Sequence, residues 1–281
     1  MNGYMTASMI KRYICMLIVL ALFASCTAGN KSYDVYLCIG QSNMAGRGDM
    51  VSGDEMILDG VYLLNDEGLP VPASAPLNIY STIRKKAEMQ GINPAWSFSQ
   101  KMYTHNRRPI LLVINAKGGT SIDLWVKTAP CDTFRVKRGD EEDWDGKPTP
   151  QFYAEAIRRT RQAMRFGELK GILWHQGESD SSSDEKRKTY MQKLTGMVKD
   201  LREDLGVPKV PFVAGEAGHN GLGEKINPVL REIKDFIPNS YCVSAEGLAL
   251  REDNVHFTRD AQIELGNRYA EAFLNKKYVQ L

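Results

Sequence analysis

Short apolar runs alternate along the chain with longer segments in which apolar residues recur every three or four positions. The short runs are typical of strands buried on both faces: Val35–Ile39, Val61–Leu64, Ile110–Asn115, Gly171–His175, Pro211–Ala214 and Tyr241–Ser244. The longer segments have helical spacing: Trp96–His105, Pro150–Phe166, Asp184–Leu205, Gly223–Phe236 and Thr258–Phe273. This alternation predicts an α/β fold with one doubly wound, mostly parallel sheet, and a site at the carboxyl ends of its strands.

Two stretches between these elements are predicted to be long loops, Asp66–Asn93 and Lys127–Pro148. Long loops in a compact domain are often functional, so both could frame a binding cleft. For the charge-dense part of the second stretch, around residues 135–145, a solvated insertion without a role is an equal alternative.

The first 25 residues have the pattern of an export signal. Lys11 and Arg12 precede the apolar run Ile14–Phe23, which is too short to span a bilayer. The small residues before Cys26 resemble a bacterial lipoprotein signal, which implies a lipid anchor on Cys26. Ordinary secretory cleavage is the alternative, because Phe23 is less usual at its position. We therefore expect export to the periplasm or to a membrane surface, a linker over residues 26–32, and one domain over residues 33–281.

Charge and cysteine content narrow the function classes. The chain has 36 Lys and Arg against 34 Asp and Glu, and the signal holds two of the basic residues and none of the acidic ones, so the rest is balanced at 34 each. This balance gives no indication of nucleic acid binding, and no other apolar run is long enough for a membrane. Cys38, Cys131 and Cys242 show no zinc or disulfide spacing, and Cys38 and Cys242 are expected to be small buried hydrophobes. We expect no metal and no cofactor.

A serine, a histidine and an aspartate have the arrangement of an acyl-transfer site. Ser42 directly follows the first strand, and Asp253 stands three residues before His256 near the end of the chain. At this spacing a turn can bring the carboxylate onto one ring nitrogen of the histidine and leave the other for the serine. Each part alone is weak evidence, because such serines often cap helices and such histidines often lie on the surface. The sequence around Ser42 is not Gly-x-Ser-x-Gly, which disfavours an α/β-hydrolase.

Two further segments could bind a developing oxyanion. Gly118 and Gly119 follow the strand Ile110–Asn115, where backbone N–H groups can approach a ligand closely. Gln176 ends the strand Gly171–His175, and its carboxamide could donate beside them. Glu178 and Asp180 could also suggest a glycosidase pair or a metal site, but nothing else in the sequence supports either. His175 is the second candidate for the base, since no carboxylate has an equally suggestive spacing.

Four islands together resemble the carbohydrate O-acetylesterases of the SGNH/GDSL hydrolase superfamily. They are Gly-Gln-Ser-Asn-Met around Ser42, Asn-Ala-x-Gly-Gly-Thr-Ser-Ile around Gly119, Trp-His-Gln-Gly-Glu-Ser-Asp around Gln176, and Asp-x-x-His at Asp253–His256. The subgroup is that of the family 6 acetylxylan esterases and the sialate O-acetylesterase-like domains, and the resemblance runs from about Tyr33 to the final helix. Gln176 stands where the wider superfamily has asparagine, a difference that the subgroup shares.

The resemblance implies a flavodoxin-like three-layer α/β/α fold, no cofactor, and removal of acetyl groups from sugar hydroxyls. It implies Ser42 as nucleophile, His256 as base and Asp253 as the residue that orients the base. The oxyanion would lie among Ser42, Gly119 and Gln176. Gln41, Asn43 and Glu178 are expected to support these groups or to contact the substrate.

The substrate is expected to be an acetylated carbohydrate. No second β-rich domain follows the esterase-like region, which favours acetylxylan or a related polysaccharide over sialate esters, the alternative. Trp96, Trp125 and Trp144 are candidate platforms for sugar rings, although each could equally be a core or loop residue. A catalytically idle glycan-binding lipoprotein is the alternative from another class.

Overall fold

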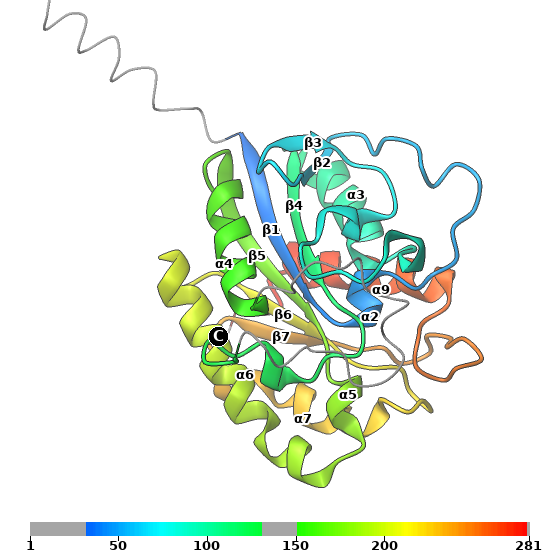
Figure 1. Ribbon diagram of the computed structural model, residues 1–281, viewed down its shortest axis with the longest axis vertical. Helices are drawn as coiled ribbons and strands as arrows, with labels where there is room; N and C mark the ends of the chain where they lie inside the picture. Colours follow the sequence, from blue (N-terminus) through cyan, green and yellow to red (C-terminus); the bar gives the residue numbers. More distant parts are fainter. Residues whose placement is uncertain (1–31, 131–150, 280–281) are drawn as a thin grey trace, which may run out of the picture. The chain divides into compact units, whose positions relative to one another are not determined.

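A seven-stranded sheet runs through residues 32–130 and 151–279, the part of the chain that this computed structural model describes (Figure 1). Its strands are β1 (Tyr33–Gly40), β2 (Val61–Leu64), β3 (Pro70–Pro72), β4 (Ile110–Ala116), β5 (Gly167–His175), β6 (Phe212–Gly215) and β7 (Ser240–Val243). They lie in the order β3-β2-β4-β1-β5-β6-β7, and all neighbours are parallel except β2 and β3. The predicted mostly parallel sheet is confirmed.

Helices cover both faces of the sheet (Figure 1). One face carries α3 (Pro94–Asn106) and α9 (Arg259–Leu274), and the other carries α4 (Phe152–Ala163), α6 (Asp184–Leu205), α7 (Asn227–Arg231) and α8 (Ile233–Phe236). Successive residues of a strand point to opposite faces, so β1 contributes Val35 and Leu37 to one core and Tyr36 and Cys38 to the other. The result is a three-layer α/β/α sandwich with two hydrophobic cores.

The long helices begin and end where the sequence has strong capping residues. The Ser183 side chain accepts a hydrogen bond from the backbone N–H of Lys186 at the start of α6, and Gly206 ends that helix with φ +68°. Thr258 caps α9 in the same way. Capping hydroxyls satisfy N–H groups that have no partner within the helix, which is why these boundaries were readable from the sequence.

The predicted helical segment Gly223–Phe236 is helical, but it is divided into short pieces. The segment contains a 3₁₀ turn, η5 (Glu224–Ile226), followed by the short helices α7 and α8. Pro228 has no N–H and clashes with a preceding helical turn, so a helix can begin near it but cannot run through it.

The predicted loop Asp66–Asn93 contains an element that the sequence pattern missed. The strand β3 lies inside it, with Pro70 and Pro72 at its ends. Proline is tolerated there because β3 is at the edge of the sheet. The 3₁₀ turns η1 (Leu77–Tyr80) and η2 (Ala87–Met89) follow in the same loop.

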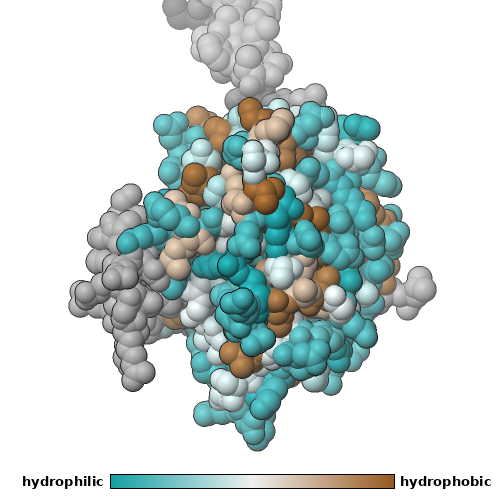
Figure 2. All heavy atoms as spheres, turned by 90° about the vertical axis from the view of Figure 1, so that its right-hand side faces the viewer, coloured by the Kyte–Doolittle hydropathy of each residue, from teal (hydrophilic) through white to brown (hydrophobic). Residues whose placement is uncertain are grey.

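Several predictions fall outside the described residues: the signal with Cys26, most of the linker, Cys131, Trp144 and the charged segment 135–145. Within residues 32–130 and 151–279, no helix is long and apolar enough to cross a membrane. On the face drawn in Figure 2, hydrophobic residues lie scattered among hydrophilic ones.

The end of β1 lies in very close contact with the end of β5. Gly40 has φ +138°, and a Cβ atom there would lie only 2.1 Å from the backbone oxygen of His175. Only glycine allows both this backbone conformation and this approach. Gly40 therefore sets the distance between the two strands just before the chain reaches Ser42.

We predict that Gly40→Ala lowers the free energy of unfolding by at least about 2 kcal/mol, because it adds backbone strain and a clash with another backbone. Urea denaturation measures the change. Gly196→Ala is the matched control: Gly196 lies inside α6 with open space around it, so alanine should stabilise the protein by up to about 1 kcal/mol. Equal stability of the wild type and Gly40→Ala would contradict this account of the strand ends.

Candidate active site

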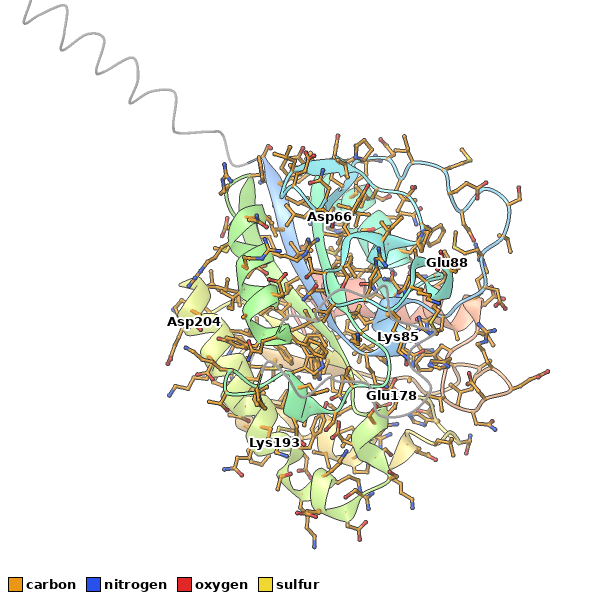
Figure 3. All side chains as sticks on the ribbon, viewed as in Figure 1. Asp66, Lys85, Glu88, Glu178, Lys193 and Asp204 are labelled. Carbon is orange, nitrogen blue, oxygen red and sulfur yellow. The ribbon has the colours of Figure 1, made fainter. Side chains whose placement is uncertain are left out.

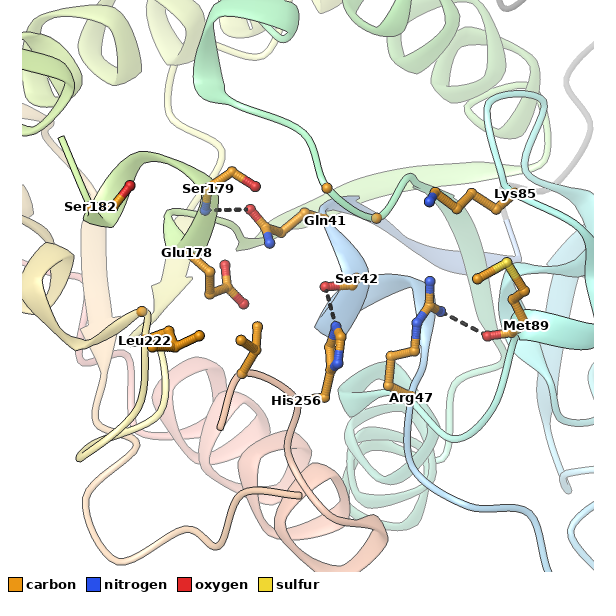
Figure 4. A pocket seen from close by; sticks show the side chains of 14 residues that line it. Gln41, Ser42, Arg47, Lys85, Met89, Glu178, Ser179, Ser182, Leu222 and His256 are labelled. Atoms are coloured by element: carbon orange, nitrogen blue, oxygen red, sulfur yellow. Dashed lines mark hydrogen bonds between the residues drawn. The ribbon is translucent and has the colours of Figure 1, made fainter. Parts of the chain in front are cut away.

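The three central strands, β4, β1 and β5, end at the same edge of the sheet and deliver the predicted residues to one cavity. β1 leads into Ser42 at the start of the one-turn helix α2 (Ser42–Ala45), and β4 leads to Gly118 and Gly119. β5 leads into α5 (Glu178–Ser181). The cavity has a volume of about 550 Å³ (Figure 4). The helices α2 and α5 are each a single turn long, which is too short for a helical hydrophobic period to be recognised in the sequence.

Ser42, His256 and Asp253 form a continuous hydrogen-bonded chain. The Ser42 Oγ lies 2.8 Å from His256 Nε2 (Figure 4). On the other side of the ring, His256 Nδ1 lies 2.7 Å from Asp253 Oδ2. The Nδ1 nitrogen donates to the carboxylate, so Nε2 is the nitrogen that can accept the serine proton. This is the geometry that a serine nucleophile, its base and an orienting carboxylate require.

Asp253 is stabilised in its ionised form. Its Oδ1 accepts the backbone N–H groups of Val255 and His256, each at 2.9 Å. Partial burial acts to raise the pKa of Asp253, but the hydrogen bonds from the backbone and ring of His256 and from Val255 outweigh it and lower the pKa to about 2. The carboxylate therefore stays charged at any pH at which the histidine could serve as a base.

Two backbone N–H groups beside the nucleophile have no partner among the described residues. They belong to Ser42 and Gly119, and both residues line the cavity. Gly119 has φ +75°, and a Cβ at Gly118 would lie 3.2 Å from the Cβ of Ser42, so the glycine loop approaches the serine closely. Such unpaired donors suit an oxyanion that forms next to the serine.

Gln176 is not placed as the expected oxyanion donor. Its side chain is buried and does not line the cavity. Its Nε2 donates to Asp180 Oδ2 at 2.6 Å, to the backbone oxygen of Thr120 at 2.8 Å and to Gln41 Oε1 at 3.2 Å, and its Oε1 accepts from the Tyr190 hydroxyl. An amide has only two N–H groups, so those of Gln176 are already engaged. The sequence could not show these partners, because they come from four segments: the residues that follow β1 and β4, and the helices α5 and α6 (Asp184–Leu205).

Asn43 connects the nucleophile segment to the segment that carries the base. Its Nδ2 donates to Glu178 Oε1 at 2.7 Å and to the backbone oxygen of Val255 at 3.3 Å, and its Oδ1 accepts the backbone N–H of Phe257 at 3.1 Å. Val255 and Phe257 flank His256, so the buried Asn43 side chain fixes the backbone on both sides of the base.

Glu178, which lines the cavity, forms a pair with the buried His175. Burial raises the pKa of Glu178 to about 6 and lowers the pKa of His175 to about 3, so the histidine is neutral and a weak base. His256, and not His175, contacts the Ser42 hydroxyl. The closest approach of the pair, from His175 Nε2 to Glu178 Oε1, is 3.7 Å. The other carboxylate oxygen of Glu178 and the Nε2 of His175 lack hydrogen-bond partners among the described residues.

The alternative uses of the acidic residues find no support in the geometry. Both oxygens of Asp180 are occupied, by Ser121, the Ile122 backbone and Gln176. Within residues 32–130 and 151–279, no group of three histidine, cysteine or acidic side chains could hold a metal ion.

Of the three expected aromatic platforms, the two that the structure describes, Trp96 and Trp125, do not line this cavity, and Trp144 lies outside the described residues. Trp125 is only 1% exposed and packs edge-on against Trp174 in the core. Trp96 lies on α3, where Arg259 stacks over its ring at 5.9 Å, and it lines a different surface hollow. None of the described residues that line the cavity is aromatic.

Two cationic side chains that the sequence did not single out line the cavity. Arg47 follows α2 and donates to the backbone oxygens of Gly46 and Met89, and Lys85 belongs to the predicted loop Asp66–Asn93. Figure 3 shows Lys85 and Glu178 near the end of the sheet at which β1 and β5 stop. The prediction that this loop frames a cleft is confirmed. A cation five residues after a candidate nucleophile was the only signal in the sequence.

Comparison with known proteins places this geometry in context. Residues 32–275 match the model of the family described as carbohydrate esterase, sialic acid-specific acetylesterase. A probable carbohydrate esterase of Arabidopsis thaliana is 29% identical over 261 residues, which cover 86% of this chain and 90% of the plant protein.

Solved structures show the same fold. An X-ray structure of the Arabidopsis thaliana protein superposes with a TM-score of 0.72 at 26% identity, covering 87% of this chain and 98% of that one. The structure of NanS has a TM-score of 0.65 at 16% identity over 87% and 97% of the two chains. A carbohydrate acetylesterase from Xanthomonas citri gives 0.58 at 17% identity over 85% of this chain and 55% of its own.

The buried carboxyl of Glu178 generates a prediction about stability and pH. Its pKa rises from 4.5 to about 6, which disfavours the ionised form by on the order of 2 kcal/mol. The stabilising contribution of the neutral carboxyl is complete below the unfolded pKa of 4.5 and is lost as pH rises through about 6. We expect Glu178→Gln to match the wild type near pH 4.5 and to exceed its free energy of unfolding by up to about 2 kcal/mol at pH 8.

Urea denaturation at a series of pH values measures this difference. Glu246→Gln, at an exposed position, is the control and should show no comparable gain at high pH. A difference between Glu178→Gln and the wild type that does not change with pH would refute the assignment.

Proposed function

We propose that this chain, which belongs to the sialic acid-specific acetylesterase family of carbohydrate esterases, removes acetyl groups from sugar hydroxyls by a Ser-His-Asp mechanism. The observation that carries the mechanism is the hydrogen-bonded chain from Ser42 through His256 to Asp253, beside two unpaired backbone N–H groups in one cavity.

The reaction proceeds by two acyl transfers. Ser42 Oγ attacks the acetyl carbonyl carbon while His256 Nε2 accepts its proton, and the carbonyl oxygen becomes an oxyanion between the N–H groups of Ser42 and Gly119. The tetrahedral intermediate collapses, His256 returns the proton to the sugar oxygen, and the sugar leaves with an acetyl group on Ser42. Water then attacks this ester with the same base, and acetate departs. Each oxyanion donor contributes roughly 2.7–4 kcal/mol to lowering the barrier.

A catalytically idle glycan-binding role is the weaker alternative. Binding alone requires neither a histidine hydrogen-bonded to a serine nor a carboxylate held ionised behind that histidine. The whole chain of contacts has a use only if Ser42 loses a proton.

The sugar is the open part of the proposal. The sequence favours acetylxylan or a related polysaccharide. Arg47 and Lys85 at the cavity favour the second candidate, an acetylated acidic sugar such as sialic acid, because both side chains would attract its carboxylate. The absence of aromatic residues from the described lining fits a small, polar ligand at least as well as a long neutral chain.

We also propose that the protein is exported and carries a lipid on Cys26. The support is the signal-like pattern of residues 1–25 alone. Mass spectrometry of the mature N-terminus tests it: an unmodified chain that still begins at Met1 would contradict export.

We predict that Ser42→Ala abolishes hydrolysis of a small acetyl ester such as 4-nitrophenyl acetate, because among the described residues Ser42 is the nucleophile that contacts His256. The thermal unfolding temperature should stay close to that of the wild type, which separates loss of chemistry from loss of folding. A serine-directed organophosphate should label Ser42 alone. Full activity in the variant would remove Ser42 from the mechanism.

Acetylated xylan and 9-O-acetyl sialic acid, assayed side by side, distinguish the two substrates. If the cations bind a carboxylate, kcat/KM should be higher for the sialate ester, and Arg47→Gln should lower it for that ester at least tenfold more than for acetylxylan. A preference for acetylxylan that Arg47→Gln leaves unchanged would support the neutral polysaccharide instead.

A further inference from the structure

Gln41 presents a hydrogen-bond donor to the cavity in a fixed orientation. Its Oε1 accepts the backbone N–H of Ser179 at 3.3 Å and the Nε2 of Gln176 at 3.2 Å. Because both partners are donors, the oxygen must face them and the nitrogen must face the other way. Figure 4 shows this nitrogen turned into the cavity, between Glu178 and Ser42.

The Gln41 nitrogen has no acceptor among the described residues, although the side chain as a whole is 2% exposed. Gln41 lines the cavity and directly precedes the nucleophile Ser42 in the chain. Gln176 differs on each point, since its N–H groups are engaged and it lies behind the cavity wall. The two carboxamides therefore have different roles. Gln176 fixes the orientation of the Gln41 side chain, and Gln41 faces the cavity.

We propose that Gln41, rather than Gln176, supplies the side-chain hydrogen bond to the ester oxygen as negative charge develops on it. This rests on the acyl-transfer function proposed above. The side-chain N–H of Gln41 would act as a third donor beside the backbone N–H groups of Ser42 and Gly119. Gln176 is then a positioning residue that fixes the Gln41 amide by donating to its oxygen, while Asp180 and Tyr190 hold Gln176 in turn.

A carboxamide suits this position better than any other side chain of its size. It must accept hydrogen bonds at one end and donate at the other. A carboxylate of the same shape could accept from Ser179 and Gln176 equally well, but its second oxygen would repel an oxyanion until it is protonated. The substitution Gln41→Glu therefore removes the N–H donor and keeps an oxygen that can accept the hydrogen bonds from Ser179 and Gln176.

The experiment is the pH dependence of kcat for Gln41→Glu on 4-nitrophenyl acetate. At pH 8 we expect kcat to fall roughly 10²–10³-fold with little change in KM, as for loss of one oxyanion donor. As pH falls, the introduced carboxyl takes up a proton and its O–H can donate. The ratio of variant to wild-type kcat should therefore rise at least tenfold between pH 8 and pH 5.

Two further variants separate donation from folding and from added charge. Gln41→Met keeps the length of the side chain without a donor, so its kcat should fall similarly but its ratio to wild type should stay flat with pH. Gln100→Glu adds the same charge on α3, outside the cavity, and should keep a ratio near one throughout. Unfolding temperatures of all three show whether each is folded.

A kcat for Gln41→Glu within about threefold of wild type at pH 8, or a ratio that does not change with pH, would overturn the assignment of Gln41. The proposed function would survive that result if Ser42→Ala were inactive. An inactive wild type would instead overturn both.

Discussion

The convergence of β4, β1 and β5 at one edge of the sheet is the constraint on which the rest of the site depends. The ladder continues one step beyond the strands: the Gln41 backbone N–H donates to the His175 oxygen at 2.9 Å, and the Lys117 N–H donates to the Gly40 oxygen at 3.1 Å. These bonds place the residues that follow each strand within reach of one another. Gly40 makes them attainable, because any side chain there would collide with β5.

The segment after β5 supports both sides of the proposed reaction centre. Through Gln176 and Asp180 it holds the backbone of Thr120 and Ile122, and thereby the glycine loop. Through Glu178 it holds Asn43, which in turn grips the peptide units around the base. A single stretch of chain therefore fixes the loop beside the oxyanion and the histidine opposite it, which explains why so many polar residues are buried here. Buried polar groups are stable when they have hydrogen-bond partners, and the polar residues of this segment serve as partners for one another and for the neighbouring loops.

The two carboxylates near the site have opposite environments. Asp253 is surrounded by donors and stays ionised, whereas Glu178 is buried beside a neutral histidine and resists ionisation. The first arrangement supports a positive charge on His256 during the reaction. The second leaves polar atoms without partners in the described structure, a destabilising feature that proteins retain mainly at functional sites.

The sequence by itself determined the layer architecture, most strands and the members of the hydrogen-bonded triad. Apolar runs, capping residues and an Asp-x-x-His spacing are local patterns, and local geometry is enough to interpret them. The sequence pattern missed β3, which only its edge position permits. It indicated helix over Gly223–Phe236 but not the division of that segment into η5, α7 and α8. Only the tertiary structure decided which of two glutamines faces the cavity, that Trp125 belongs to the core, and that Arg47 and Lys85 belong to the site. The physical reason is that a side chain's role depends on its hydrogen-bond partners and its burial, and these come from segments far away in the chain.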